Sequence, residues 1–252
     1  MFLIYALMSL LVAAPLLVTA VAVGVLVLYA AIVTAAYWGF TLSDGALRML
    51  VLLHFYRLGY SPFTLAFLFL LYEAMGIVAN WVGGWLATRY GIARMLAVGL
   101  ATQIAGFLLL SMLSPSWTAA MSVAWVVVAQ GICGVAKDLT KTASKSAIKL
   151  TAGEASGRLF KWVAFFTGSK NAMKGIGFFL GGLLLEALGF QASLWIMAAL
   201  LAGVLAGVVM FVLLPAFAGM LALLFRHRGF SLTEHLVFAL HLHAFWFGTI
   251  AW

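Results

Sequence analysis

Long apolar runs alternate with short polar gaps along almost the whole chain. A membrane-spanning helix needs about 20 mostly apolar residues, because the hydrocarbon layer is about 30 Å thick and each residue rises about 1.5 Å. Runs of this length recur between turn signals. The pattern predicts an all-α bundle of six transmembrane helices, followed by a shorter apolar helix, over residues 30–56, 62–88, 94–113, 118–136, 160–187, 191–214 and 232–252.

A hydrophobic extension, residues 1–28, precedes the first of these helices. The first charged residue is Asp44. One straight helix over the preceding stretch would measure about 65 Å, twice what a bilayer accommodates, so we expect a bend, an extra span or a break near Pro15 or Gly24. Ala20-Val21-Ala22 is similar to a signal-peptide cleavage site, but the positive segment that normally precedes one is missing. The predicted domains are therefore the extension, a six-helix bundle over 29–214, and a loop with an apolar helix over 215–252.

Composition excludes a soluble protein. Hydrophobic residues make up 66% of the chain and charged residues 8%, against about 25% charged in an ordinary soluble domain. The net charge of +8 does not indicate nucleic-acid binding, because the basic residues lie in short gaps between apolar runs. Cys133 is the only cysteine, so no internal disulfide can form. The expected location is a lipid bilayer, as an integral protein of a bacterial inner membrane.

Positive charge in the predicted gaps falls almost entirely on one side of the membrane. Cytoplasmic loops retain Lys and Arg, so this side is predicted to be cytoplasmic. Ten of the eleven loop or helix-end cations collect there, and only Arg57 lies on the other side. The ten are Arg89, Arg94, Lys137, Lys141, Lys145, Lys149, Arg158, Lys161, Arg226 and Arg228.

Five charges fall inside predicted helices. They are Asp44, Arg48, Glu73, Lys170 and Lys174. Each costs about 2.5 to 3.5 kcal/mol at the bilayer centre even on the lenient insertion scale. Asp44 and Arg48 share a helix face, as do Lys170 and Lys174, and Glu73 shares one with Asn80. The three helices therefore have polar stripes that must face inward.

Counting these charges gives two negative and three positive ones, which leaves one cation over. A buried surplus cation requires an anion, so the pattern favours a cavity for an anionic substrate. A purely structural charge network remains the alternative. Neutral hydrogen bonds are expected from Thr41, Ser43, Tyr72, Gln130 and Asn171.

The predicted third and sixth helices have no internal charges and are expected to be peripheral. Two glycine pairs, Gly177 with Gly181 and Gly203 with Gly207, predict close helix packing.

The arrangement resembles one half of a major facilitator superfamily transporter. The segment Gly84–Arg94 is similar to the loop signature of that superfamily, with Gly84, Arg89, Gly91 and Arg94 in the expected places. Thr88 stands where an Asp is usual, which puts the charge relay of that loop in doubt.

Four longer segments resemble the organoarsenical efflux permeases of this superfamily, and the resemblance covers about residues 29 to 214. The segments are Tyr37–Phe63, Phe67–Gly91, Gly134–Leu150 and Gly157–Gly182. The resemblance implies export of an arsenate ester of a phosphoglycerate or a related phosphorylated acid. It also implies an assignment of roles: substrate binding by Arg48, Lys170, Lys174, Asn80 and Asn171, and coupling or positioning by Asp44 and Glu73.

Two features depart from that family. Its members contain two related six-helix halves with the site between them, so this chain is expected to need a second copy or another half. Otherwise it is a partner-dependent membrane scaffold without transport of its own. The segment Thr233–Phe245 instead resembles a short stretch of an uncharacterised membrane-protein family, so a fusion, a truncation and an artificial composite all stay open.

Enzymatic and metal-binding patterns are weak. Glu234, His235, His241 and His243 suggest a metal site, but His241 and His243 point about 200° apart on a helix. Ser146–Lys149 and Gly175–Gly177 match short catalytic and dinucleotide motifs without the context those motifs need. We therefore expect no enzyme activity, no metal and no cofactor. Because no phosphate-binding loop for ATP is visible, transport is expected to be driven by a gradient.

Lys137, Lys141, Lys145 and Lys149 recur every four residues, which is typical of topological charge or of a helix on an anionic lipid surface.

Overall fold

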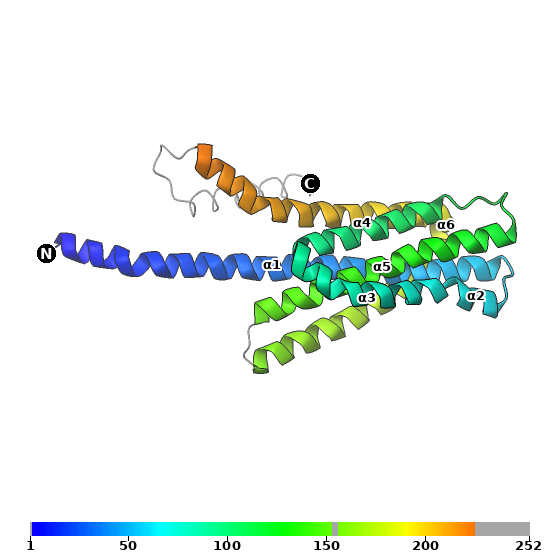
Figure 1. Ribbon diagram of the computed structural model, residues 1–252, viewed down its shortest axis with the longest axis horizontal. Coiled ribbons are helices and arrows are strands. Elements are labelled where there is room, and N and C mark those ends of the chain that lie inside the picture. Colours follow the sequence, from blue (N-terminus) through cyan, green and yellow to red (C-terminus); the bar gives the residue numbers. More distant parts are fainter. Residues whose placement is uncertain (1, 153–155, 225–252) are drawn as a thin grey trace. The chain divides into compact units, whose positions relative to one another are not determined.

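The computed structural model describes residues 2–152 and 156–224, which are helical almost throughout and contain no strand. The helices are α1 (Phe2–Arg57), α2 (Pro62–Leu68), α3 (Leu70–Tyr90), α4 (Ile92–Ser111), α5 (Ala119–Ala152) and α6 (Ser156–Leu224) (Figure 1). Among the described residues, four stretches are long and apolar enough to cross a membrane: Pro62–Tyr90, Ile92–Ser111, Ala119–Ala147 and Phe160–Phe211. The all-helical prediction is confirmed, and these stretches indicate an integral membrane protein.

The chain forms two compact units, one of residues 1–29 with 209–252 and one of residues 30–208. All of the predicted intramembrane charges belong to the second unit, so the candidate site lies within it. The helix predicted over 232–252 lies outside the described residues. The predicted domain boundaries stay a prediction.

Helix α1 is longer than predicted. It continues through Pro15 and Gly24 without interruption, so the break expected near either residue does not occur. The predicted boundary at residue 136 was also wrong, because α5 continues to Ala152. The lysines that suggested a loop are at helical spacing, and the residues between them, Leu139, Ala143 and Ala147, are buried.

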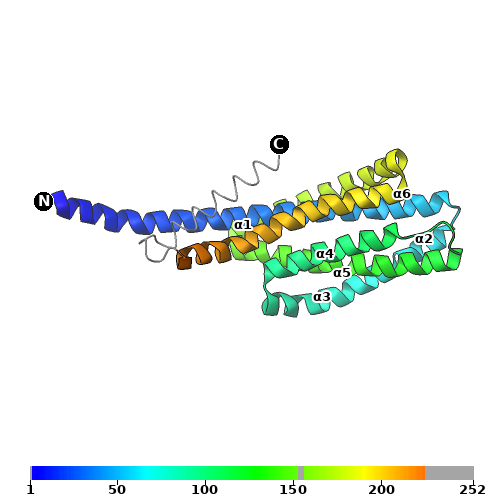
Figure 2. The same ribbon diagram turned by 90° about the horizontal axis from the view of Figure 1, so that it is seen from above.

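Several breaks divide the helices of the second unit, among them those at Phe69, Gly91 and Gly189. Phe69 separates α2 from α3. Within α6, Gly189 has φ +78° and ψ 177°, a conformation that glycine adopts without steric cost. The chain turns back here (Figures 1 and 2), in the gap predicted at Gly189-Phe190. The turn is supported by the Ser193 hydroxyl, which donates to the Gly189 carbonyl at 2.5 Å.

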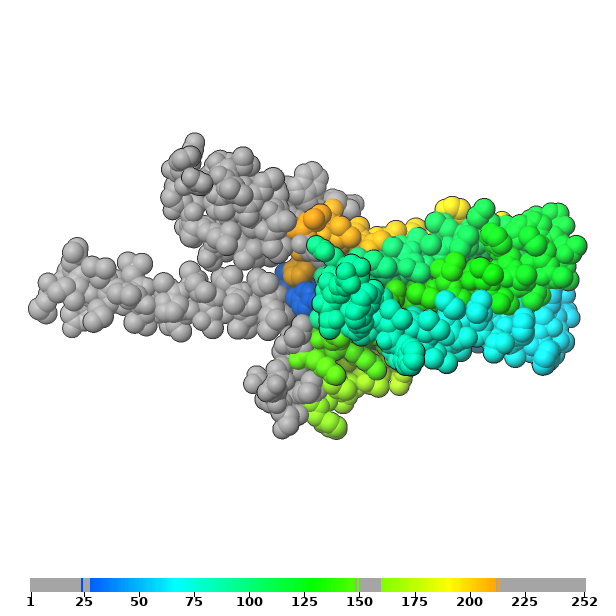
Figure 3. Space-filling model, in the orientation of Figure 1, coloured from blue at the N-terminus to red at the C-terminus, as the bar shows by residue number. Residues whose placement is uncertain are grey.

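Helix α5 packs against both α3 and α4, and the three helices adjoin on one face of the molecule (Figure 3). Small residues allow the helices to approach closely. At the contact of α1 with α6, a side chain at Gly177 would collide with the Leu42 carbonyl, and one at Gly181 with the Ala46 carbonyl. The predicted second pair differs, because Gly203 and Gly207 have nothing within 4 Å of an added Cβ. The backbones of α1 and α6 therefore touch beside the charged residues.

Candidate functional site

A cavity of about 250 Å³ lies among α1, α3, α5 and α6 within the second unit. Helix α1 contributes five of its lining residues, which recur at three- and four-residue spacing and so share one face. The lining residues are Tyr37, Phe40, Thr41, Asp44, Arg48, Glu73, Lys137, Lys141, Lys170 and Lys174. Five of the ten are cations and two are carboxylates.

Asp44 is the buried anchor of the cavity, with 5% of its surface exposed. The Tyr72 hydroxyl donates to Asp44 Oδ1 at 2.5 Å, and Arg48 Nε lies 3.7 Å from Oδ2. The Arg48 guanidinium lies over the Tyr72 ring, 4.4 Å from its centre. Since a buried carboxylate must be compensated, these contacts hold Asp44 and Arg48 in one arrangement.

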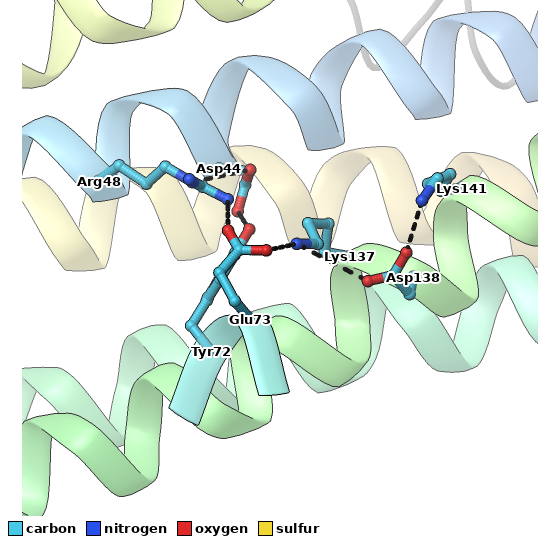
Figure 4. Close-up of polar contacts among 7 residues, drawn as sticks. All are labelled: Asp44, Arg48, Tyr72, Glu73, Lys137, Asp138 and Lys141. Carbon is cyan, nitrogen blue, oxygen red and sulfur yellow. Dashed lines mark hydrogen bonds and ion pairs between the residues drawn. The ribbon is translucent and has the colours of Figure 1, made fainter. Parts of the chain in front are cut away.

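From Arg48 the charges continue as an alternating chain across three helices (Figure 4). Arg48 Nη2 donates to Glu73 Oε1 at 3.0 Å, and Lys137 Nζ donates to Glu73 Oε2 at 2.9 Å. Asp138 accepts from Lys141 at 2.9 Å and lies 3.7 Å from Lys137. We call Asp44, Arg48, Glu73, Lys137, Asp138 and Lys141 the charge network. It contains three acids and three bases and is neutral.

The α6 wall of the cavity is different. Lys170 and Lys174 lie one turn apart, and no carboxylate among the described residues is within 4 Å of either. Lys174 Nζ lies 5.6 Å from the centre of the Phe178 ring, and Lys170 is repelled by the neighbouring lysines. Three carboxylates of the described chain lie within 4 Å of any of the five lining cations, namely Asp44 and Glu73 of the lining and Asp138 behind it, which leaves two unbalanced positive charges. Uncompensated charge is costly away from bulk water, so the cavity is suited to an anion.

Five of the predicted site residues line this one cavity. They are Asp44, Arg48, Glu73, Lys170 and Lys174. Asn80 and Asn171 do not line it, and both are exposed. The roles that the resemblance implies for all seven stay predictions.

Only some of the neutral side chains that were expected to add hydrogen bonds at the site lie beside the cavity. Thr41 lines the cavity and Tyr72 binds Asp44, whereas the Ser43 hydroxyl donates to the Phe40 carbonyl of its own helix. Gln130 is fully buried, and its amide has no hydrogen-bond partner among the described residues.

Sequence reasoning missed the contribution of α5. The pattern predicts Lys137 and Lys141 as topological charge or as part of a helix on an anionic lipid surface, and it does not indicate Asp138 as a site residue. The available signal was the four-residue spacing from Lys137 to Lys149, a stretch without Gly or Pro that directly follows an apolar run. That spacing indicates one helix with its charges on a single face.

The loop signature lies away from the cavity, and none of its residues lines it. Gly91 has φ +82° and forms the turn between α3 and α4, which a residue with a Cβ would strain. The Arg89 guanidinium lies 5.3 Å from the centre of the Trp85 ring. Arg94 is exposed, and Gly84 has open space around it. The turn itself explains Gly91, and the structure gives no account of Gly84.

In the described part of the chain, no three His, Cys, Asp or Glu side chains form a group able to hold a metal ion. Glu234, His235, His241 and His243 lie outside those residues. No protein-family model matches the sequence, and no curated protein matches it significantly.

Proposed function

We propose that this protein is a secondary transporter that exports a small organic anion across a bacterial inner membrane. The observation that carries the proposal is the cavity among apolar helices in which five cations meet and Lys170 and Lys174 have no carboxylate within 4 Å in the described chain. A membrane helix retains such charges for a purpose, because each is costly to insert. The absence of an ATP-binding motif from the sequence supports gradient-driven movement.

The size and charge of the cavity support the proposed substrate class. Two unbalanced cations favour a doubly charged anion over a singly charged one. A volume of about 250 Å³ accommodates a small metabolite. An arseno-phosphoglycerate, as the resemblance to organoarsenical permeases implies, or a related phosphorylated acid has this chemistry.

Arg48, Lys170 and Lys174 bind the anion in this proposal, together with Lys137 and Lys141, which line the same cavity. Asp44 positions Arg48, and Glu73 positions Arg48 and Lys137 from the other side. Protonation of one of these carboxylates would couple transport to a proton gradient.

Transport into everted membrane vesicles tests the proposal. Vesicles that contain the protein should accumulate radiolabelled 3-phosphoglycerate, a stable phosphorylated acid, when a proton gradient is imposed. Lys170→Gln with Lys174→Gln should abolish accumulation. Lys161→Gln, on the same helix but outside the cavity, is the matched control. Equal uptake by vesicles with and without the protein would refute the proposal.

A second candidate function is a half-transporter that acts only as a membrane scaffold with a partner. The observation that favours a partner is polar surface on α3, where the Glu73 side chain is 56% exposed and Asn80 is exposed. Exposure of such polar groups to lipid is energetically unfavourable, so they need a protein neighbour or water. A second copy or another six-helix half would cover them. Size measurement in detergent tests the homodimer, which a stable monomer would exclude.

A further inference from the structure

The three carboxylates of the charge network differ sharply in exposure. The side chains of Asp44 and Asp138 are 7% and 5% exposed, whereas that of Glu73 is 56% exposed. Glu73 nevertheless makes two of the shortest ion pairs in the network, at 3.0 and 2.9 Å. It is therefore the one acid of the network that is both strongly paired and open to the surroundings.

The geometry of Glu73 is that of a bound anion. Each of its two oxygens accepts from a cation of a different helix, Oε1 from Arg48 on α1 and Oε2 from Lys137 on α5 (Figure 4). Glu73 also lines the same cavity as the two lysines of α6. A phosphoryl or carboxylate group would present the same pair of oxygens to the same two donors.

Leaving this position is easier for Glu73 than for the other acids. Exposed ion pairs contribute little to stability, whereas breaking a buried pair leaves an uncompensated charge. Arg48 and Lys137 each keep a second carboxylate if Glu73 moves away, namely Asp44 and Asp138. Glu73 can thus move away while Arg48 stays paired with Asp44 and Lys137 stays paired with Asp138.

We propose that Glu73 is a tethered counter-anion, which occupies half of the anion site until a substrate displaces it. This inference rests on the proposed anion-binding function and adds to it a means of selection. A ligand must compete with a carboxylate already in place, so only a multiply charged anion that also engages Lys170 and Lys174 binds well. A singly charged anion gains too little to displace Glu73.

Binding of two probes to the full chain in nanodiscs tests the displacement. The probes are 3-phosphoglycerate and the monoanion lactate, measured by calorimetry. Glu73→Gln removes the competing charge at nearly constant volume and should bind 3-phosphoglycerate about tenfold more tightly, because the ligand then displaces a neutral amide instead of a carboxylate held by two cations. Discrimination against lactate should fall. Glu186→Gln is the matched control, since Glu186 is also an exposed, paired acid but lies outside the cavity.

The outcomes separate this inference from the proposed function. If the wild type binds 3-phosphoglycerate and Glu73→Gln binds it equally or more weakly, Glu73 is a structural or binding group and the displacement is refuted, while anion binding stands. If neither chain binds either probe, both ideas fail. Binding by Glu73→Gln alone would support displacement most strongly. Should Glu73→Gln not fold, Glu73→Asp, which keeps the charge on a shorter side chain, should also bind more tightly than wild type, and weaker binding would refute the inference.

Discussion

On the side of the cavity formed by α1, α3 and α5, every lining cation has a carboxylate within ion-pair distance, whereas on the α6 side Lys170 and Lys174 have none in the described chain. The charge network, which includes the first wall and Asp138 behind it, contains three acids and three bases, and the second wall adds two positive charges. The two walls are joined where the backbones of α1 and α6 touch at Gly177.

This difference predicts that the first wall contributes most to stability, while the α6 wall supplies the surplus positive charge for anion binding. Removing one member of a buried pair leaves an uncompensated charge, which is strongly destabilising. Removing a lysine that has no carboxylate beside it instead relieves repulsion among neighbouring cations. Substitutions of the buried acids Asp44 and Asp138 should therefore weaken the fold, and substitutions of Lys170 and Lys174 should weaken binding and spare the fold.

The largest effect is expected for Asp44→Ala. It removes the buried acceptor of the Tyr72 hydroxyl and one partner of Arg48, at a cost of about 3 kcal/mol in unfolding free energy. Asp44→Asn keeps an acceptor for Tyr72 and should cost less. Both are measured by denaturant unfolding in detergent. An unchanged unfolding midpoint for Asp44→Ala would show that the network does not stabilise the bundle.

Next in size is the double change Lys170→Gln with Lys174→Gln. Charge-assisted contacts contribute about 1.5 to 3 kcal/mol each, so affinity for 3-phosphoglycerate should fall at least about 100-fold. The unfolding midpoint should stay the same or rise, because two uncompensated charges are gone. Calorimetric titration measures the affinity, and thermal unfolding measures the midpoint. Retained affinity together with lower stability would instead show that Lys170 and Lys174 stabilise the fold and do not bind the anion.

Gly177→Ala should have an intermediate effect, because it separates the two walls. The added Cβ would collide with the Leu42 carbonyl of α1, at a cost of about 1 to 3 kcal/mol. Gly203→Ala is the matched control in the same helix, where nothing lies within 4 Å. That control should be neutral or slightly stabilising, because Ala has the higher helix propensity. Equal unfolding midpoints for the two variants would contradict the close contact of α1 with α6.

The smallest effect is expected at the ion pair between Arg57 and Glu186, which joins α1 to α6 outside the cavity. Both side chains are mostly exposed, at 56% and 69%. Glu186→Gln should therefore change the unfolding free energy by less than about 1 kcal/mol. A loss as large as that of Asp44→Ala would mean that exposure does not distinguish weak from strong pairs in this protein.

Much of the site was predictable because charges inside apolar runs are visible in the sequence. Asp44, Arg48, Glu73, Lys170 and Lys174 were selected on that basis, and all five line one cavity. The same criterion failed for Lys137 and Lys141, because they follow the apolar run instead of interrupting it. Asn80 and Asn171 were assigned from the resemblance and lie elsewhere, since sharing a helix face with a charged residue does not place a side chain in a cavity.

By itself the sequence determined that the chain is helical and apolar enough to cross a membrane, and which charged residues interrupt its apolar runs. Both properties are local, because they depend on run length and on spacing along one helix. Only the tertiary structure decided which charges meet. Glu73 pairs with Arg48 and Lys137, which lie 25 and 64 positions away in the chain, and such pairs depend on how helices pack. The same packing leaves Lys170 and Lys174 without a carboxylate within 4 Å in the described chain, because the three acids beside the cavity pair with the cations of α1 and α5 instead.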